Sequence, residues 1–408
     1  MPRTSILSRI AHTGHTDAPE LTPGAQWWSG LDPSFWRKPE RFDLGAVDRL
    51  RIGATAGIDL AIRTAGACLV GTFAGPPGYH PGQLRELEGD LKFYAPFADS
   101  GDPHRFFVPP PRGVKVDVER APWPAFRPAG GLCEDLRFSS PFVPMNPRLR
   151  LPYLSLAGNR RAHARYWRHH DGPRPTIIAI HGFSADLSLL NEWFFALPWF
   201  YNLGCDVVLF TLPFHGARQT RFSPFSGHGF FAGGPSRINE AFAQAVCDFR
   251  VLLNHLEDRY GVRDVGVSGV SLGGYTASLL ATLDPRLRFV IPNVPLVSLA
   301  DLVLEWHPLS AIVWTALRAT GVTLADIRHL LAVHSPLTYQ PIIPKNRRFI
   351  VGGVGDRLAP PKHSRLLWEH WDHCRIHWFP GSHLLHLDKG QYLKQIRSFM
   401  QELDFLKK

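Results

Sequence analysis

A serine flanked by two glycines stands out among the residues whose types and spacing could carry out chemistry. Gly269-Val270-Ser271-Leu272-Gly273 has the G-x-S-x-G spacing that places a serine on a sharp turn between a strand and a helix. Serine is a weak nucleophile in water, so it needs an exposed, fixed position and a neighbouring base. The sequence predicts a strand over 264–268 and a helix over 272–283, which is the required context. We therefore predict that Ser271 is a nucleophile; the alternative is a glycine turn that serves only close packing.

Asp356 and His383 are the residues that we expect to serve this serine as acid and base. A predicted strand over 348–354 leads into Gly355-Asp356-Arg357, and one over 375–379 leads into Gly381-Ser382-His383. Side chains just past the carboxyl ends of parallel strands meet at one edge of the sheet. There His383 would take the proton of Ser271 and return it to the leaving group, while Asp356 holds the imidazole tautomer. Two residues compete for these roles: Asp301, which also follows a strand, and His386, which lies one helical turn after His383.

Two backbone amides are expected to complete this machinery. The predicted strand over 175–180 leads directly into His181-Gly182-Phe183. A developing oxyanion needs fixed N–H donors more than it needs any side chain. The amides of Phe183 and Leu272 are placed for that role, so we predict that they form an oxyanion hole.

The elements that must position these residues alternate between strand and helix from about residue 150 onward. Short β-branched runs are typical of strands buried on both faces of a sheet. Strand–helix alternation indicates an α/β protein with a mostly parallel sheet and helices on both faces. Strands are predicted over 161–169, 175–180, 206–212, 264–268, 288–293, 348–354 and 375–379, and helices over 187–197, where Pro198 ends the helix, 235–257, 272–283 and 390–403.

Residues 298–336 interrupt the alternation with helices alone. Helices are predicted over 299–306, 308–319 and 323–333, the last beginning with a capping box of Thr323 and Asp326. An all-helical insert between two strands cannot join the sheet. We expect it to form a lid; the alternative is a packing pair remote from any site.

The first 150 residues differ in composition and periodicity from residues 151–408, which we assign to one α/β domain. They are rich in proline and aromatic residues, with weak periodicity apart from a predicted helix over 46–67. Proline-rich segments do not continue helices or central strands. We therefore expect an ordered but irregular extension that packs as an arm on the domain.

The charge and hydropathy of the chain indicate whether it could bind a nucleic acid or a membrane. The chain has 408 residues, a net charge of +10, 45% hydrophobic and 20% charged residues, which suits a large buried core. Its positive charges are spread out rather than gathered in a basic arm, so no nucleic-acid partner is expected. The uncharged stretch 64–84 is broken by prolines, so we predict no transmembrane segment. A mildly cationic surface leaves peripheral contact with a membrane open.

Cysteine and histidine usage predicts neither disulfides nor a metal site. The five cysteines are scattered and form no C-x-x-C pair, which indicates a reducing compartment. No apolar signal segment follows Met1, so a cytoplasmic location is expected. His370, His373, Cys374 and His377 have a spacing that can bind zinc, but they span a helix end and a strand and should diverge.

In combination, these motifs resemble the α/β-hydrolase superfamily. His181-Gly182-Phe183, the serine turn, Gly355-Asp356 and Gly381-Ser382-His383 come in the family's order, each after a strand. The resemblance covers about two thirds of the chain and implies the α/β-hydrolase fold, with Ser271, Asp356 and His383 as a triad that needs no cofactor or metal. The segment 212–218 resembles a loop that borders the site in some members. His215 and Arg218 are therefore candidates for substrate contact, with a structural turn as the alternative.

The function that follows is a serine hydrolase acting on a small-molecule carboxylic ester or thioester through an acyl-enzyme. A peptidase or an acyltransferase would use the same triad and would differ in cleaving an amide or in adding an alcohol or amine to the product. A non-catalytic binding scaffold is the third reading, and the complete triad speaks against it. Five aromatic residues are candidates to line an acyl pocket, with core packing as the default: Trp193, Phe194, Phe195, Phe230 and Phe231.

Overall fold

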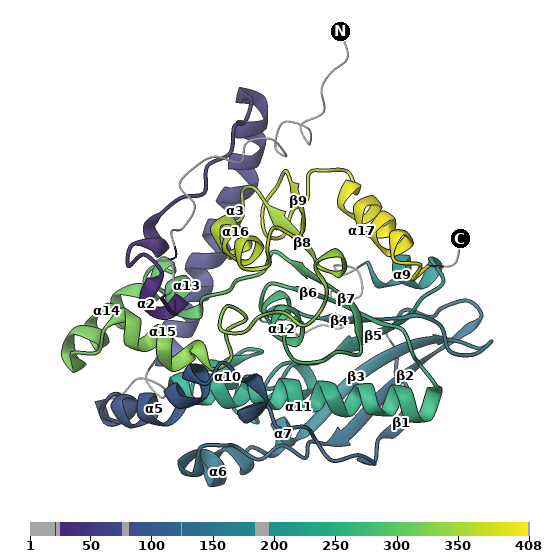
Figure 1. Ribbon diagram of the computed structural model, residues 1–408, viewed down its shortest axis with the longest axis horizontal. Coiled ribbons are helices and arrows are strands. Elements are labelled where there is room, and N and C mark those ends of the chain that lie inside the picture. Colours follow the sequence, from purple (N-terminus) through teal and green to yellow (C-terminus); the bar gives the residue numbers. More distant parts are fainter. Residues whose placement is uncertain (1–20, 22–24, 76–80, 124, 184–195, 407–408) are drawn as a thin grey trace.

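A mostly parallel sheet forms the centre of the computed structural model, which describes residue 21 and residues 25–75, 81–123, 125–183 and 196–406 (Figure 1). In this described part, nine strands follow the order β1-β2-β3-β5-β4-β6-β7-β8-β9. Strands β4 to β9 are mutually parallel, whereas β1, β2 and β3 extend the sheet in antiparallel fashion. The strands are β1 (Asp117–Arg120), β2 (Gly131–Ser139), β3 (Arg161–His169), β4 (Thr176–Ile180), β5 (Asp206–Phe210), β6 (Val265–Val270), β7 (Leu287–Asn293), β8 (Phe349–Gly353) and β9 (Arg375–Phe379).

Helices cover both faces of the central strands. Because alternate residues of a strand point to opposite sides of the sheet, they pack in different hydrophobic clusters. In β4, Ile178 and Ile180 pack in one hydrophobic cluster and Ile177 and Ala179 in another. The first cluster includes α11 (Gly234–Tyr260), α12 (Leu272–Leu280) and α16 (Pro361–His370). The second includes α9 (Leu197–Asn202) and α17 (Gln391–Glu402). The expected α/β class with helices on both faces is confirmed.

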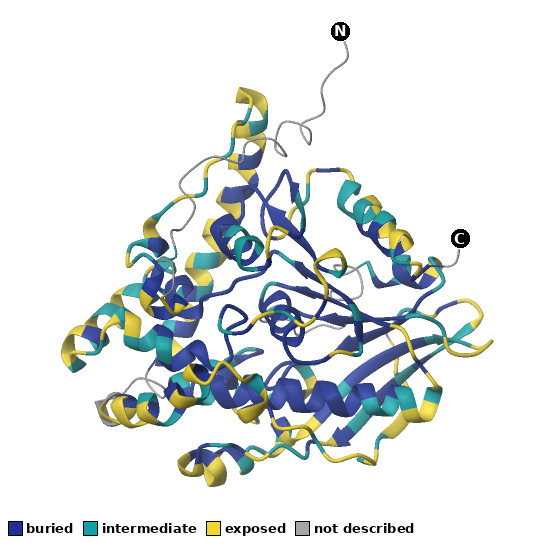
Figure 2. Ribbon diagram, in the orientation of Figure 1, coloured by how far each residue is buried: buried dark blue, intermediate teal, exposed yellow. Residues whose placement is uncertain are grey.

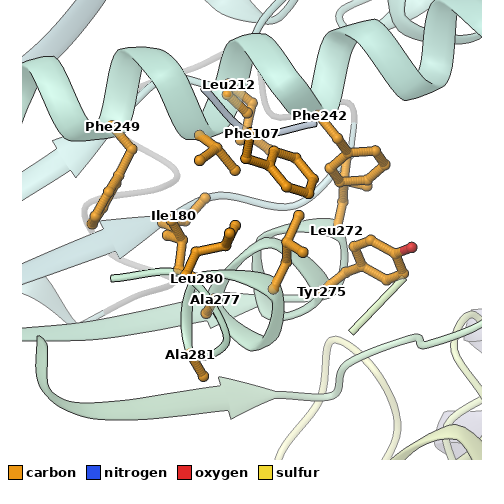
Figure 3. Packing of buried hydrophobic residues seen from close by; sticks show 14 of the residues in the cluster. Phe107, Ile180, Leu212, Phe242, Phe249, Leu272, Tyr275, Ala277, Leu280 and Ala281 are labelled. Atoms are coloured by element: carbon orange, nitrogen blue, oxygen red, sulfur yellow. The ribbon is translucent and has the colours of Figure 1, made fainter. Parts of the chain in front are cut away.

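The packing of α11 against α12 is the part of the core that positions the site. Phe242 and Phe249 of α11 lie above Leu272, Tyr275 and Leu280 of α12 (Figure 3). These side chains are at most 1% exposed. Burial of this kind contributes about 1.5–3 kcal/mol for each large side chain, so the turn that precedes α12 is held by a rigid layer.

The insert forms the three helices that the sequence predicts, namely α13 (Leu299–Glu305), α14 (Leu309–Thr320) and α15 (Leu324–Ala332). The capping box of Thr323 and Asp326 is confirmed. The insert contacts the core helix α11 and also α2 (Trp27–Gly30), α3 (Ala46–Phe73) and α5 (Pro81–Asp99). It therefore lies between the core and the N-terminal helices. Its role as a lid stays a prediction.

The N-terminal 150 residues contain more regular structure than their weak periodicity predicts. The helix α3 continues to Phe73, six residues beyond the predicted end, and α5 accommodates Pro96 in its interior. The strands β1 and β2 belong to the central sheet, since β2 pairs with β3 along its whole length. The described chain also contains α6 (Pro147–Leu154), α7 (Ala157–Arg160) and α10 (His228–Phe231). β1 is an edge strand that is exposed along its whole length, so it lacks the buried β-branched run by which a central strand is predicted.

Most of the range 187–197 lies outside the described residues, and the helix α9 begins only at Leu197. Pro198 stands in the first turn of this helix. Proline is tolerated there because the first-turn N–H groups have no intrahelical acceptor.

Candidate active site

Ser271 lies on the turn between β6 and α12, in a backbone conformation that is unusual for a residue with a side chain. Its φ is 57° and its ψ is −115°. A Cβ at Gly269 would lie 2.1 Å from the carbonyl oxygen of Gly273, and one at Gly273 would lie 2.0 Å from the carbonyl oxygen of Ile180. Both glycines are thus required by close backbone approach. The turn presents Ser271 at the carboxyl end of the sheet, half-buried rather than enclosed.

The turn after β4 lies directly beside this serine. A Cβ built on Gly182 would stand 3.4 Å from the Cβ of Ser271. His181 fixes the turn, because its Nε2 accepts the N–H of Leu212 at 3.0 Å while Nδ1 lies 2.8 Å from the carbonyl oxygen of Gly182. The amide of Phe183 follows, and Leu272, as the first residue of α12, has an N–H without an acceptor in its own helix. These are the two amides for which the sequence predicts a role in an oxyanion hole.

His383 and Asp356 are joined by a short hydrogen bond. The distance from His383 Nδ1 to Asp356 Oδ2 is 2.6 Å, and both side chains are buried. The other carboxylate oxygen accepts the N–H groups of Leu358 and Ala359 at 2.9 and 2.8 Å. Because a carboxylate only accepts, Nδ1 carries the proton and Nε2 is left to act as a base. In the described part of the chain the structure joins His383 to Asp356 but shows no hydrogen bond between His383 and Ser271.

The electrostatic environment of His383 favours its protonated form. Burial by itself would lower the pKa of this imidazole. The charge and hydrogen bond of Asp356, together with the charge of Asp59, outweigh burial and raise the pKa above its ordinary value. A base of this kind holds a proton more readily than a free histidine does.

Asp59 is a residue near the site that the sequence analysis missed. It lies on α3, is fully buried, and its Oδ2 accepts the N–H of His383 at 2.7 Å and that of Arg357 at 3.1 Å. One turn later, Arg63 donates to the carbonyl oxygen of Arg357 at 3.0 Å. The local signal is an isolated pair of charges, Asp59 and Arg63, in the otherwise uncharged stretch from Ile52 to Phe73.

The two competing assignments lie elsewhere. Asp301 forms a buried ion pair with Arg328, at 2.6 Å between Oδ1 and Nη2. His386 stacks on Phe379 with ring centroids 3.8 Å apart, and burial lowers its pKa to about 4. Of the candidates, only Asp356 and His383 contact each other as an acid and a base of a triad would.

The structure places His215 and Arg218 inside the protein, which favours the structural alternative for both. The Arg218 guanidinium is fully buried and bonds Asp248 at 2.7 Å as well as the carbonyl oxygens of Thr211 and Asn159. His215 is also fully buried, and its Nδ1 lies 2.8 Å from the carbonyl oxygen of Pro213. Neither is accessible to a substrate, so the expected substrate contacts are replaced by contacts within the core.

The histidine and cysteine cluster near the last strand diverges in space. His370 bonds the carbonyl oxygen of Tyr339, while His377 lies 3.5 Å from Asp388. His373 packs edge-on against Trp368, and the buried Cys374 thiol lies 3.6 Å from the carbonyl oxygen of Arg375. Among the described residues, no group of three or more histidine, cysteine or acidic side chains is arranged to hold a metal ion.

Comparisons with known proteins reveal both close sequence relatives and more distant structures. Two Mycobacterium tuberculosis proteins, uncharacterized protein MT2702 of strain CDC 1551 / Oshkosh and uncharacterized protein Rv2627c of strain ATCC 25618 / H37Rv, are each 32% identical over 314 residues. The match covers 73% of this chain and 70% of each relative. No family model matches the sequence.

Two solved structures share the arrangement of the sheet and its helices. Acetyl xylan esterase 1 from Thermoanaerobacterium sp. JW/SL YS485 has a TM-score of 0.52 at 18% identity, over 78% of this chain and 93% of that one. An acetyl xylan esterase from Paenibacillus sp. R4 has a TM-score of 0.53 at 15% identity, over 77% and 94% of the two chains. At such identities the likeness concerns the fold.

Proposed function

This chain belongs to the same family as the two Mycobacterium tuberculosis proteins and has the α/β-hydrolase fold, and from that premise we propose that it is a serine hydrolase. Its substrate would be a carboxylic ester or thioester, cleaved through an acyl-enzyme. The observation that carries the proposal is the strained backbone of Ser271 on the turn between β6 and α12. Left-handed strain at a residue with a side chain is typical of functional sites, where the surrounding structure maintains it.

The proposed reaction assigns one role to each group. His383 Nε2 accepts the proton of Ser271 as Oγ attacks the substrate carbonyl, and Asp356 stabilises the resulting imidazolium. The N–H groups of Phe183 and Leu272 bind the tetrahedral oxyanion. His383 then gives its proton to the departing alcohol or thiol, which leaves Ser271 acylated. Water, deprotonated by the same histidine, attacks the acyl group in the second half-reaction and restores the serine.

An apolar acyl group is the substrate portion that the surroundings favour. The Phe183 ring contacts Phe225 and Phe231, with centroids 5.9 and 5.1 Å apart, and all three rings are only partly buried. Phe230 is fully buried against Phe242 and belongs to the core. Residues 193–195 lie outside the described part of the chain. The proposed acyl pocket thus begins at the Phe183 side of Ser271.

The compartment that we propose is the cytoplasm. Cys205, Cys247 and Cys374 are buried free thiols, and Cys68 is an exposed one. Free thiols persist in reducing compartments. Fractionation of cells that produce the protein would test this location.

The test of function is covalent labelling with a fluorophosphonate, which reacts with activated serines. We expect labelling of the wild type and its loss in Ser271→Ala and in His383→Ala, whereas Ser398→Ala on the surface helix α17 should label normally. Circular dichroism of each variant would verify folding. A folded wild type that never labels would contradict the proposal and favour a binding scaffold.

Substrate screening then separates the alternatives. Esters and thioesters of graded acyl length should be hydrolysed in a manner that depends on Ser271. Faster cleavage of a matched amide would favour a peptidase. Product that carries an added alcohol or amine instead of water would favour an acyltransferase.

A further inference from the structure

We infer that Asp59 is a positioning residue, whose carboxylate holds the two loops that carry Asp356 and His383 in their working arrangement and whose charge stabilises the protonated imidazole of His383. The inference rests on the proposed function of the same site. It assigns to the N-terminal helix α3 a part of the active site that residues 151–408 do not supply by themselves.

The hydrogen bonds of α3 to the two loops carry this inference. Asp59 Oδ2 accepts the backbone N–H of His383 at 2.7 Å and that of Arg357, the neighbour of Asp356, at 3.1 Å. Arg63 donates to the carbonyl oxygen of Arg357 at 3.0 Å, so α3 bonds both polar backbone groups of that residue. A single oxygen thus joins the acid loop to the base loop. Removing it would release two loops rather than one.

The charge of Asp59 has a second consequence for the imidazole. A buried carboxylate is costly, and an asparagine could accept the same backbone hydrogen bonds at lower expense. Asp59 Oδ1 is buried without a hydrogen-bond partner among the described residues, which adds to that cost. The charged or titratable groups facing His383 are Asp356 from the loop after β8, Asp59 from α3 and His386 from its own loop. Arg63 interacts with both aspartates.

Two substitutions at Asp59 separate geometry from charge. Asp59→Asn keeps an acceptor oxygen but removes the charge, whereas Asp59→Ala removes both. The matched control is Asp48→Asn, about three turns earlier on the same helix. Nuclear magnetic resonance of histidine labelled with carbon-13, assigned with His383→Ala, would give the pKa of His383 in each variant. Steady-state kinetics on the best ester would give kcat and KM against pH.

In Asp59→Asn we expect a lower pKa of His383 and a matching shift of the acid limb of kcat/KM to lower pH. In Asp59→Ala we expect kcat to fall on the order of tenfold to a hundredfold with little change in KM, because misplaced catalytic groups lose rate rather than affinity. Asp48→Asn should match the wild type. An unchanged His383 pKa in Asp59→Asn, or a folded Asp59→Ala with wild-type kcat, would overturn the inference.

These experiments distinguish a failure of the inference about Asp59 from a failure of the proposed hydrolase function. A wild type that does not label with fluorophosphonate would remove the proposed hydrolase activity. The histidine titration needs no turnover, so it would still decide whether Asp59 acts on His383. If Asp59→Ala does not fold, Asp59→Asn remains decisive.

A second inference rests on the opposite face of the same helix. By length and composition α3 is the one described helix that could cross a membrane, yet only 22% of its apolar window is buried. Figure 2 shows exposed positions along α3, and every exposed residue from Ile52 to Phe73 is uncharged. The charged residues in that span, Asp59 and Arg63, bond the active-site loops. Ile58, Ile62, Leu69 and Phe73 recur at helical spacing and are each more than 40% exposed. At 1.5 Å per residue the span is about 33 Å long.

We propose that this outer face of α3 lies on the surface of an anionic lipid bilayer. A continuous exposed apolar face of this length is unusual for a soluble monomer and marks an interaction site. Arg49 and Arg51 are exposed at its N-terminal end, and the net charge of +10 suits anionic headgroups while opposing self-association. The helix would lie in the interface instead of crossing it, because Ile52 packs with Trp378 and Val354 and the inner face bonds the active-site loops.

Vesicle sedimentation tests this second proposal. Vesicles of phosphatidylglycerol and phosphatidylcholine should bind the wild type, and pure phosphatidylcholine should bind it less. Ile58→Ser/Ile62→Ser should lower partition at least tenfold, because it removes two half-exposed apolar side chains from the face that would enter the interface. Leu151→Ser/Phe222→Ser, which alters two isolated exposed apolar residues, should bind like the wild type.

Two results would overturn the membrane proposal. The first is equal binding, or no binding, of the wild type and the Ile58→Ser/Ile62→Ser variant to anionic vesicles. The second is a wild-type dimer in light scattering that the same variant breaks, because the face would then be occupied by a second copy of the chain.

Discussion

At the scale of single residues, the central feature is the balance of charges around one imidazole. Burial disfavours the charged form of His383, while Asp356 and Asp59 favour it, and the net result is a raised pKa. The general base must be neutral to accept the proton of Ser271. Protonation of His383 therefore sets the pH below which the proposed activity is lost.

We predict that kcat/KM falls toward low pH with an apparent pKa above 6.5, the ordinary value of a histidine. The sign follows from the raised pKa, since a proton that binds more tightly leaves at a higher pH. A pH profile of ester hydrolysis between pH 5 and 9 would measure it. An acid limb with an apparent pKa below 6.5 would show that burial outweighs the effect of Asp356 and Asp59 on the pKa of His383.

At the scale of elements, the geometry of the site depends on how closely β4, β6 and α12 approach one another. Gly273 lies against the end of β4, where a methyl group would stand 2.0 Å from the carbonyl oxygen of Ile180. That carbonyl belongs to the strand whose next residues form the turn beside Ser271. A wider spacing would move the two proposed oxyanion donors apart.

Two glycine substitutions test this packing. Gly273→Ala should destabilise the fold by about 1–3 kcal/mol and abolish fluorophosphonate labelling, because rigid backbone cannot give way. Gly53→Ala on α3, where nothing lies within 4 Å of the added methyl, should instead stabilise by about 0.5–1 kcal/mol. Urea unfolding of both variants measures the contrast. Normal labelling of Gly273→Ala would mean that the turn tolerates expansion.

At the scale of the whole molecule, buried cations attach the N-terminal segment to the insert and the core. Arg328 pairs with Asp301 and also donates to the carbonyl oxygens of Leu31 and Asp32. Lys362 donates to the carbonyl oxygens of Phe35 and Trp36 and lies 3.0 Å from Glu305. These bonds explain why a proline-rich segment is ordered where it contacts the domain.

Removing one of these cations should detach the segment. We predict that Arg328→Met lowers the free energy of unfolding by about 3–5 kcal/mol, because Asp301 would be left buried without its partner. Limited proteolysis should then cut between residues 27 and 40 faster than in the wild type. Arg318→Met, at an exposed position of α14, is the control. Equal protection of the Arg328→Met variant would show that the segment is held by its aromatic residues alone.

Asp301→Asn gives a related prediction about the competing acid. Since Asp301 serves Arg328 and not His383, the variant should lose stability but keep kcat, whereas Asp356→Asn should lose most of its activity. Steady-state kinetics beside urea unfolding separates the two effects. Severe loss of kcat in a folded Asp301→Asn with a harmless Asp356→Asn would overturn the acid assignment.

Much of the fold could be predicted because it depends on local patterns. Buried parallel strands appear as short β-branched runs, and the helix over 234–260 shows its apolar period without any partner. The Ser271 turn was also predictable, because the motif places one glycine two residues before the serine and one two residues after it. Only glycine fits where backbone segments approach each other this closely. Asp356 and His383 followed from their place just after two strands. Their catalytic roles remain predictions until labelling and kinetics test them.

What the sequence by itself determined is therefore most of the strands and helices after residue 160, the serine turn and the strand ends that face it. Only the tertiary structure decided that Asp301 and His386 have other partners, that His215 and Arg218 are buried, and that Asp59 bonds the loop of a histidine 324 positions away. Contacts across such separations leave no trace in periodicity or spacing. They depend on which surfaces meet when the N-terminal helices pack on the domain, and that is set by the shape of the whole core.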